Sequence, residues 1–303
     1  MGSSDGQWYP AEWPARIRAL ARGELTPPEP RAAATVLLLR DGSAGLEVFL
    51  LRRRLSMAFA AGAYAYPGGS VDPRDGAAAT EPAELVTRAA LRELFEEAGV
   101  LLAGPTPGEL VADVSGPDWE ADRRALAAHE LSVSALLDRR SLVPRADLLR
   151  PWARWITPEF ETRRYDTWFF VAALPPGQRT RNASTEADHI AWLRPADAVA
   201  GYDRGALTMM PPTIATLRAL APHATADAAL AAAADRDMTP VLAQARLVGD
   251  EVVLSWPGHR EFEKRVPGDR APNAPAPAVD PVVVDPVVGE AWEQPTQMER
   301  DGR

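Results

Sequence analysis

The chain has 303 residues, of which 46% are hydrophobic and 25% are charged, and its formal net charge at pH 7 is −9. This length and composition allow a substantial buried core, so we expect one main domain with additions rather than two independent domains. The absence of cysteine excludes disulfides, thiolate metal sites and cysteine nucleophiles, and the negative charge argues against nonspecific binding of nucleic acid, which needs a basic surface.

No membrane or export signal is evident in the sequence. No apolar run approaches the length of a membrane span, and residues 1–5 lack the basic and apolar regions of a signal peptide. The last three residues, Asp301-Gly302-Arg303, are not a peroxisomal address. We therefore expect a soluble, cytoplasmic protein. Lys264 is the only lysine, and this preference for arginine, with abundant alanine and proline, indicates a GC-rich bacterial genome.

The first elements along the chain are an N-terminal arm and a β-hairpin. Residues 1–30 contain aromatic residues and prolines, and they form either an arm packed over the core or a flexible lead. Residues 33–39 and 46–51 are short apolar runs. Because a glycine-containing loop separates the two runs, they predict a β-hairpin.

A glycine turn and an acidic helix follow the hairpin. Gly68 and Gly69 come directly after Pro67, and two adjacent glycines there predict a tight turn whose backbone can approach a ligand closely. From residue 83 the pattern becomes helical, with an apolar stripe on one side and oppositely charged pairs on the other. Gly99 predicts the end of this helix.

Three carboxylates crowd the last turns of this helix. Glu93 is three residues from Glu96 and four from Glu97, and these separations bring side chains onto one helix face. Arg92 is the basic residue beside them. Two interpretations follow: an acidic surface patch, or a site for Mg²⁺ or Mn²⁺, which are hard cations that prefer carboxylate oxygens.

The flanking residues favour the cation site. Residues 68–100 resemble the signature of the Nudix hydrolases, G-x5-E-x7-R-E-U-x-E-E-x-G-U, in which U is an apolar residue. From Glu84 onward the match is complete, since seven residues separate this glutamate from the run at residues 92–100. The chain is therefore identified as resembling that family.

The sequence departs from the signature at its first glycine. Ala78 stands where the family has that glycine, and Gly69 lies nine positions earlier. We interpret the difference as an insertion at residues 73–82, where extra loop length costs little entropy. The insertion leaves the helix unchanged but puts the placement of Gly69 against a metal in question.

Two further stretches resemble the coenzyme A and acyl-coenzyme A diphosphatases within that family. Gly62 and the Tyr-Pro-Gly-Gly run at residues 66–69 are similar to their G-x3-F-P-G-G element. The arginine that precedes this element is absent, because Ala58 stands there. Residues 154–170 look like the long form of this group, which is related to peroxisomal acyl-CoA diphosphatases. Altogether the similarity covers residues 30–220.

The second half of the chain predicts alternating helices and strands. Residues 118–134 are typical of a helix, with a loosely ordered insertion as the alternative, and His129 is expected on the surface of that helix. The other expected elements are strands at 152–156, 167–174 (the central one) and 190–193, helices opening at 194–197 and within 207–220, and a hairpin at 246–256.

The resemblance implies an α/β protein with the Nudix α/β/α sandwich, a mixed β-sheet and helical insertions. We expect an N-terminal arm at 1–30 and a Nudix hydrolase domain at 31–222, with an insertion at about 104–150. A C-terminal extension at 223–265 precedes a tail at 266–303. We expect this tail to be disordered, because its Pro, Ala, Val and Asp residues show no packing period.

The resemblance also assigns metal ligands. Glu93, Glu96 and Glu97, with the backbone carbonyl of Gly69 or of Gly68, are expected to bind Mg²⁺ or Mn²⁺. The residue at the position of Glu93 is often either a ligand or the base that orients water in this family.

Other side chains are expected to support the reaction. Arg92 would orient the carboxylates by charge-assisted hydrogen bonds. Glu84 either supports the metal ligands or is a helix-start carboxylate favoured by the dipole. Glu186 is the expected distant ligand or base, because it lies six residues before Trp192 as in related sequences. Asp188 is the second choice, and a solvated loop carboxylate is the alternative for Glu186.

Two groups of arginines are candidates for binding the phosphates of a substrate. Arg52, Arg53 and Arg54 stand at a predicted strand end, and Arg163 and Arg164 precede another strand. For both groups the alternative is a structural pairing with nearby acidic residues. We expect at least one arginine of the first group, Arg52 or Arg54 above all, to face the substrate.

The resemblance predicts metal-dependent hydrolysis of a phosphoanhydride in a nucleoside diphosphate that is linked to another moiety. Coenzyme A or acyl-CoA is the leading substrate, and ADP-ribose or another nucleotide sugar is the alternative. The alternative of another class is a noncatalytic nucleotide sensor, although such proteins often lose glutamates that this chain keeps. A thioesterase lacks a nucleophile here. We expect no nucleic-acid or membrane partner, and a homodimer stays open.

Overall fold

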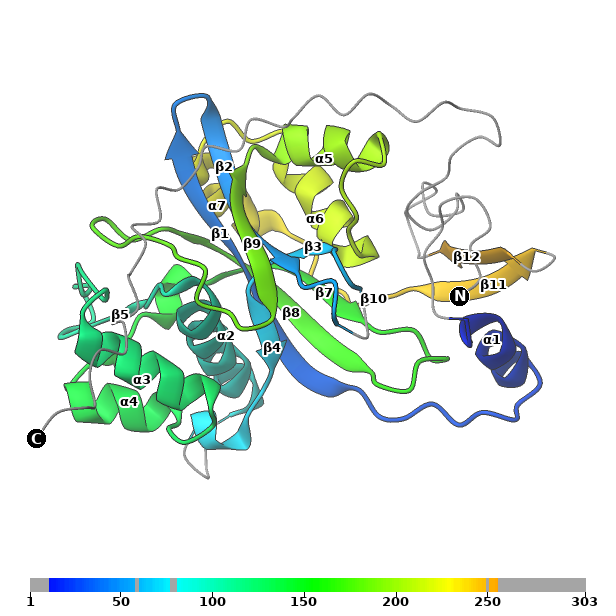
Figure 1. Cartoon of the computed structure of the whole chain (residues 1–303), viewed down its shortest axis with the longest axis horizontal. Helices are drawn as coiled ribbons and strands as arrows, with labels where there is room; N and C mark the ends of the chain where they lie inside the picture. The colour runs from blue at the N-terminus through cyan, green and yellow to red at the C-terminus, as the bar shows by residue number, and fades with distance from the viewer. Residues whose placement is uncertain (1–10, 58–59, 77–80, 249–250, 256–303) are drawn as a thin grey trace, which may run out of the picture.

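A computed structural model describes residues 11–57, 60–76, 81–248 and 251–255 (Figure 1). The tail expected at 266–303 lies outside these residues. The helices are α1 (Trp13–Ala21), α2 (Pro82–Ala98), α3 (Pro117–Ala127), α4 (Val133–Arg140), α5 (Pro195–Asp203), α6 (Pro211–Leu220) and α7 (Ala226–Ala232), with 3-10 turns η1 (Pro73–Asp75), η2 (Ala146–Leu148) and η3 (Ala233–Asp235).

The strands are β1 (Arg31–Gly42), β2 (Gly45–Arg53), β3 (Tyr64–Ala65), β4 (Gly68–Ser70), β5 (Ala103–Gly104), β6 (Val143–Pro144), β7 (Arg150–Ile156), β8 (Tyr165–Ala173), β9 (Ala187–Leu193), β10 (Val241–Leu242), β11 (Gln244–Val248) and β12 (Glu251–Ser255). Among the described residues, no helix is both long and apolar enough to cross a bilayer.

A mixed sheet forms the centre of the molecule. Its strands follow the order β10-β7-β8-β1-β2-β3, while β4 also pairs with β1 and β9 also pairs with β2. Strands β1 and β8 are parallel, whereas β1 and β2 form the antiparallel hairpin that the sequence predicts. Strand β1 is buried on both faces, which explains its continuous apolar run.

Helices cover both faces of the sheet, as an α/β/α sandwich requires. On one face, α2 packs Leu91 and Leu94 against Val36 and Leu38 of β1. On the other face, α5, α6 and α7 cover the intervening β1 residues, including Leu37 (Figure 1). The expected fold class is therefore confirmed, and the two faces can be considered separately.

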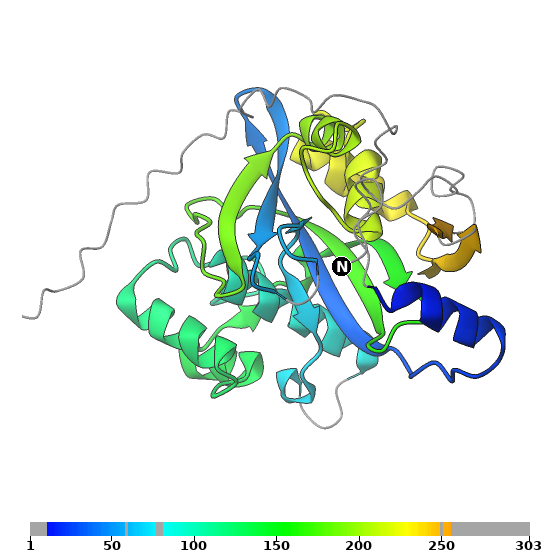
Figure 2. The same ribbon diagram turned by 45° about the vertical axis from the view of Figure 1, so that its right-hand side comes forward.

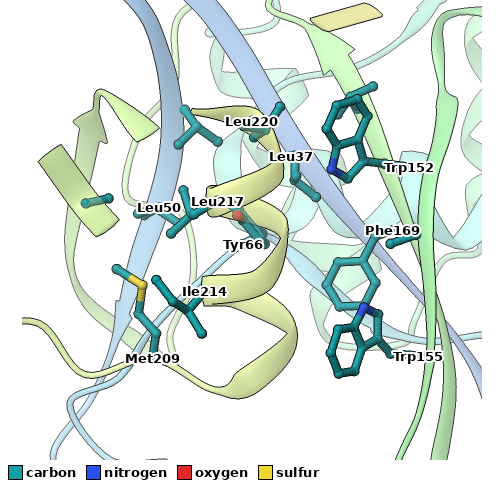
Figure 3. Close-up of a cluster of buried hydrophobic side chains, with 14 of the residues drawn as sticks. Leu37, Leu50, Tyr66, Trp152, Trp155, Phe169, Met209, Ile214, Leu217 and Leu220 are labelled. Atoms are coloured by element: carbon teal, nitrogen blue, oxygen red, sulfur yellow. The ribbon is translucent and has the colours of Figure 1, made fainter. Parts of the chain in front are cut away.

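The face beneath α6 is a large apolar core. In Figure 3, Ile214 and Leu217 of α6 point toward the sheet, where Trp152 and Phe169 lie on β7 and β8. All of these side chains except Phe169, which is 6% exposed, are fully buried. The Tyr66 hydroxyl lies 3.0 Å from the Thr216 hydroxyl of α6, so this core also anchors the segment that leads into β4. The tight turn predicted at Gly68 and Gly69 is wrong, because both residues pair with β1 in that strand.

The additions at both ends of the domain pack on the same side of the molecule. Trp13 of α1 is 4.9 Å, centroid to centroid, from the ring of Phe160, in an edge-on arrangement, and Ile17 is also buried. The expected C-terminal hairpin is present as β11 and β12, which contact α1; its expected turn, residues 249–250, lies outside the described residues. The described part of the N-terminal arm is thus packed on the core.

The prediction of one helix at 118–134 is wrong, because two helices occupy this region. Helix α3 ends before His129, whose φ of 57° lies in the left-handed region. Helix α4 starts after Ser132, whose hydroxyl accepts a hydrogen bond from the Ala135 amide as an N-cap. His129 is exposed, as expected.

The insertion that contains α3 and α4 is ordered rather than loose. Leu126, Val133 and Leu136 are fully buried and share a cluster with Phe95 of α2. Figure 2 shows the two short helices beside each other, on the side of α2 away from α5 and α6. The insertion is therefore packed directly against the acidic helix.

Candidate active site

Helix α2 carries three carboxylates near its C-terminal end. Glu93 and Glu96 are each 8% exposed, and Glu97 is partly exposed. The helix starts with Pro82 and ends at Gly99, whose φ of 69° is the left-handed conformation that glycine adopts readily. The carboxylates therefore lie at the negative end of the helix dipole, and the last turn of α2 itself contains no basic residue.

The Arg92 guanidinium is the centre of a buried charge network. Its Nη1 lies 2.8 Å from Glu93 Oε1 and 3.2 Å from Glu96 Oε1, and its Nη2 donates to the Ser70 carbonyl at 2.8 Å. Its Nε donates to Asp75 Oδ2 at 2.9 Å. Although burial alone would lower the pKa of Arg92, the surrounding carboxylates raise it. Arg92 thus stays charged and fixes the orientation of its neighbours.

Asp75 is a member of this network that the sequence did not predict. It is fully buried, and its Oδ1 has no hydrogen-bond partner among the described residues. Asp75 ends the 3-10 turn of the inserted loop, which Asp72 caps. The spacing of Asp72 and Asp75 is a signal for this turn. Nothing local indicates the ion pair with Arg92, seventeen positions along the chain.

Gly68 and Gly69 of β4 lie directly against the carboxylates, despite the lengthened loop. The Gly68 amide donates to Glu97 Oε2 at 2.9 Å. A Cβ at Gly69 would overlap the Glu93 carboxylate, and one at Gly68 would overlap the backbone and hydroxyl of Thr35. Gly68 therefore has no room for a side chain, whereas a side chain at position 69 would have to displace the Glu93 carboxylate. The insertion at residues 73–82 has not moved either glycine away from α2.

Burial disfavours the charged form of all three carboxylates, and the groups around them offset this effect only in part. It raises the pKa of Glu97 to about 8, helped by the neighbouring charges of Glu93 and Glu186. It also raises the pKa of Glu93 to about 7, in opposition to the attraction of Arg92. Burial raises the pKa of Glu96 too. Each proton held in this way marks a charge that a bound cation could neutralise.

The chemistry of these groups fits a hard divalent cation. Glutamate and backbone carbonyl oxygens are the donors that Mg²⁺ and Mn²⁺ prefer. In the described part of the chain, however, no three His, Asp or Glu side chains converge closely enough to form a complete ligand set. Arg92 lies between Glu93 and Glu96, and Glu97 accepts from Gly68. A cation would therefore need at least one of these carboxylates to rotate.

The loop before β9 places Glu186 next to this cluster. Its backbone amide donates to the Ser184 hydroxyl at 3.1 Å, and that hydroxyl donates to Glu97 Oε1 at 3.3 Å. The Glu186 side chain is exposed. Asp188, the second choice, instead forms an ion pair with Arg52 at 2.7 Å. Ser184 was not predicted, because a serine in a loop carries no local signal for such a contact.

The predicted phosphate-binding arginines differ in their surroundings. Arg52 is 41% exposed in its side chain and keeps its ion pair with Asp188. Arg54 lies beside the expected base, because its amide donates to the Glu186 carbonyl at 2.9 Å. Its guanidinium Nε contacts the Ala187 carbonyl at 3.4 Å. The end of β2 therefore brings Arg54 to the loop that carries Glu186, and Arg52 to the start of β9.

Arg164 holds backbone segments together. Its Nε and Nη1 donate to the carbonyls of Thr157 and Pro28, at 3.0 and 2.9 Å, and the residue is 9% exposed. The expected acidic partners were Glu159, Glu161 or Asp166, and Asp166 pairs with Arg154 instead. Arg163 is exposed and is the better candidate of the two for a substrate.

Glu84 lies in the first turn of α2 and is apart from the carboxylate cluster. It forms an ion pair with Arg88 at 2.8 Å, and its side chain is 51% exposed. Arg88 in turn donates to the Ser134 hydroxyl at 2.8 Å and to the Asp75 carbonyl at 3.3 Å. These contacts favour the interpretation of Glu84 as a helix-start carboxylate. Glu84 is linked to the Arg92 network only indirectly, through Arg88.

Comparisons with known proteins agree with this geometry. The family described as the NUDT19 Nudix domain matches residues 77–220. The crystal structure of a NUDIX hydrolase from Alicyclobacillus acidocaldarius is 30% identical, with a TM-score of 0.61, and the match covers 70% of this chain and 99% of that one.

Curated relatives give a similar result over shorter stretches. The acyl-coenzyme A diphosphatase NUDT19 of Homo sapiens is 33% identical over 144 residues, or 44% of this chain and 38% of the relative. Putative nudix hydrolase 7 of Caenorhabditis elegans is 27% identical over 190 residues, or 63% of this chain and 60% of the relative. In both cases the match spans less than two thirds of the relative's length.

Proposed function

We propose a function from the premise that the chain belongs to the Nudix hydrolase family and resembles its acyl-CoA diphosphatase branch. The protein would hydrolyse a phosphoanhydride bond in a nucleoside diphosphate that is linked to another moiety. The observation that carries this proposal is the packing of Gly68 and Gly69 against the desolvated carboxylates of Glu93 and Glu97. An ordinary acidic surface patch has no need of that close approach.

The proposed ligands for Mg²⁺ or Mn²⁺ are Glu93, Glu96 and Glu97, with the Gly69 carbonyl as a neutral fourth donor. When bound, such a cation offsets the charge of the pyrophosphate oxygens and helps to orient the attacking water. Arg92 keeps the carboxylates in place through its contacts with Glu93 and Glu96. Because burial disfavours their charge, these carboxylates have a strong electrostatic reason to bind a cation.

Two carboxylates are candidates for the base that accepts the proton of the attacking water. Glu186 is exposed beside Glu97 and is tied to it through Ser184. Glu93 is the other candidate, since its pKa is raised to about 7 by burial, and a base works best with a pKa near the working pH. We favour Glu186, because Glu93 also serves as a proposed metal ligand.

The arginines at the end of β2 are proposed to hold the phosphates of the substrate. Arg54 contacts the loop that carries Glu186, and Arg52 contacts Asp188 at the start of β9. A guanidinium can bind a phosphate through two parallel hydrogen bonds. Arg163 is a further candidate. Arg52 would exchange its present partner, Asp188, for the substrate.

The proposed substrate is coenzyme A or an acyl-CoA. Water would attack phosphorus, the bond between the two phosphates would break, and the products would be 4′-phosphopantetheine, or its acyl form, and adenosine 3′,5′-bisphosphate. The support is the similarity to the human relative, which is named acyl-coenzyme A diphosphatase, together with the resemblance of residues 62–69 and 154–170 to that branch.

A panel of diphosphates tests this proposal. The purified chain is incubated with Mg²⁺ or Mn²⁺ and with coenzyme A, an acyl-CoA, ADP-ribose and a nucleotide sugar, and products are identified by mass spectrometry. We expect the two CoA species to be cleaved fastest. A preference for ADP-ribose would favour the alternative substrates, ADP-ribose or another nucleotide sugar, over coenzyme A. Binding of a nucleotide without turnover of any compound would favour a noncatalytic sensor.

A further inference from the structure

The carbonyl groups in the last turn of α2 accept hydrogen bonds from residues outside the helix. The carbonyls of residues 96–98 lie where a helix leaves its acceptors without partners of its own. The Glu96 carbonyl accepts a hydrogen bond from Arg123 Nη1 at 2.9 Å. The next two carbonyls accept from the backbone amides of Ala183 and Arg181, at 3.3 and 3.0 Å. The insertion and the loop before β9 therefore cap the helix that carries the carboxylates.

Arg123 links the insertion to the loop before β9. It comes from α3 in the insertion, and it is 8% exposed. The same Nη1 that binds the Glu96 carbonyl also donates to the Ala183 carbonyl at 2.9 Å. One nitrogen atom thus links the insertion, the end of α2 and the loop before β9.

The loop held in this way carries the groups that face the cluster. Ser184 directly follows Ala183, and its hydroxyl donates to Glu97 Oε1. The same hydroxyl accepts from the amide of Glu186. A shift of the loop would therefore change the position of the Glu97 carboxylate and of Glu186 together.

The orientation of Arg123 is itself fixed. Its Nε and Nη2 bind the two oxygens of the Glu120 carboxylate at 2.9 and 2.6 Å, which is the paired geometry that a guanidinium favours. Glu120 also accepts from Arg181 Nη2 at 3.0 Å, so it contacts the loop as well. Since the last turn of α2 has no basic residue, Arg123 also supplies the positive charge that suits the end of a helix.

We infer that Arg123 is a positioning residue of the active site, which keeps the end of α2 and the loop with Ser184 and Glu186 in register. It contacts no reacting atom and acts through the carbonyls of Glu96 and Ala183. This inference rests on the proposed function, because it assigns Arg123 to the placement of the groups proposed there. The insertion is, on this account, part of the catalytic machinery rather than a decoration.

The test compares Arg123→Ala with Arg124→Ala. Arg124 is the matched control, because it adjoins Arg123 on α3, binds the same Glu120 carboxylate at 3.0 Å, and is 74% exposed in its side chain. With coenzyme A and Mn²⁺ we expect Arg123→Ala to lower kcat by about tenfold or more, since small displacements of catalytic groups are costly. We expect KM to change by less than about threefold, because the phosphate-binding arginines lie elsewhere.

Two readouts do not depend on turnover. Amide hydrogen exchange in residues 181–186 should accelerate in Arg123→Ala and remain at the wild-type rate in Arg124→Ala. The affinity for Mn²⁺ alone, measured by calorimetry, should fall in the same variant. If the wild-type chain cleaves none of the diphosphates, the proposed function fails, and the exchange and Mn²⁺ comparisons still decide whether Arg123 holds the loop.

Arg123→Lys covers the case in which the alanine variant does not fold. A lysine keeps the charge but lacks the planar fork that binds Glu120 and both carbonyls together. We therefore expect kcat and loop exchange between those of the wild type and of Arg123→Ala. Wild-type kcat, Mn²⁺ affinity and exchange in folded Arg123→Ala or Arg123→Lys would overturn the inference. A lowered melting temperature with unchanged kcat would do the same.

Discussion

The two faces of the central sheet both have apolar cores, but only the α2 face also buries a cluster of charged residues. Beneath α6 the core contains aliphatic and aromatic side chains such as Leu217 and Trp152. Beneath the end of α2 the buried residues include Arg92, Glu93 and Glu96. Burying an apolar side chain stabilises a fold by about 1.5–3 kcal/mol, whereas burying a charge costs several kcal/mol before its partners offset it.

Because of this difference, the two faces contribute differently to the stability of the fold and to the proposed reaction. Apolar side chains hold both faces of the sheet to their helices, while the end of α2 also buries charged groups that a stable fold would otherwise avoid. The raised pKa of Glu97 and that of Glu93 are the signs of that cost. We therefore expect substitutions on the charged face to change activity, and substitutions on the apolar face to change the free energy of unfolding.

The largest expected effect belongs to Glu97→Gln. Losing a metal ligand should lower kcat by about 10³-fold or more. The melting temperature of the metal-free protein should not fall, because the glutamine oxygen can still accept from the Gly68 amide, its NH2 group can donate to the Ser184 hydroxyl oxygen, and the side chain cannot carry a desolvated charge. The control is Glu47→Gln, which alters a carboxylate paired with Arg40. Equal kcat values for the two variants would contradict the assignment of Glu97.

Leu217→Ala tests the opposite face. This side chain is fully buried beneath α6, and such a truncation lowers the free energy of unfolding by about 2–5 kcal/mol. We expect kcat of the folded protein to stay within about twofold of wild type, because no charged group of the site is touched. Chemical denaturation measures the first quantity. Leu55→Ala, at a side chain that is 76% exposed, should change neither.

Asp75→Asn probes the network without removing a proposed metal ligand. The amide keeps an acceptor for Arg92 but loses the charge that helps to orient it, so we expect kcat to fall by about tenfold. Asp166→Asn is the control, because it weakens a comparable ion pair, with Arg154, on β7 and β8. The role of Asp75 would be contradicted by steady-state rates that are the same in both variants.

The last expected effect, which needs no substitution, is the pH dependence of Mn²⁺ binding. Burial raises the pKa of Glu97 from its ordinary 4.5 to about 8, so the folded chain holds this proton more tightly than the unfolded chain does. Between pH 4.5 and 8, the free energy of unfolding of the metal-free protein should therefore fall as the pH rises. Mn²⁺ must displace the proton, so its affinity should rise with pH, by up to about tenfold per unit.

Calorimetry at pH 6, 7 and 8, in two buffers with different ionisation enthalpies, measures both the affinity and the protons released. A Mn²⁺ affinity that stays the same over this range, with no proton release, would show that the site does not bind through protonated carboxylates.

Local patterns in the sequence predicted much of this structure. The acidic run of α2, its stop at Gly99 and the β1–β2 hairpin follow from periodicity and turn residues, and each is confirmed. The sequence did not predict the contacts between distant segments. The pairing of Asp75 with Arg92 and the bridge from Arg123 to two carbonyls depend on how elements pack, and no spacing in the sequence indicates them.

The errors have a similar cause. The expected single helix at 118–134 is divided because Ser132 caps a second helix, and that local signal competes with a continuous helical pattern. Arg164 was expected to bind a substrate or an acidic side chain. It binds the carbonyls of Thr157 and Pro28 instead, and backbone acceptors cannot be read from residue types.

The central claim is that the acidic end of α2 binds a divalent cation, and a Mn²⁺ titration followed by electron paramagnetic resonance tests it most directly. Wild-type protein at pH 8 is compared with the double variant Glu93→Gln and Glu97→Gln. We predict saturable binding to the wild type and its loss in the folded double variant. Equal Mn²⁺ uptake by both proteins, or none by the wild type, would contradict the claim.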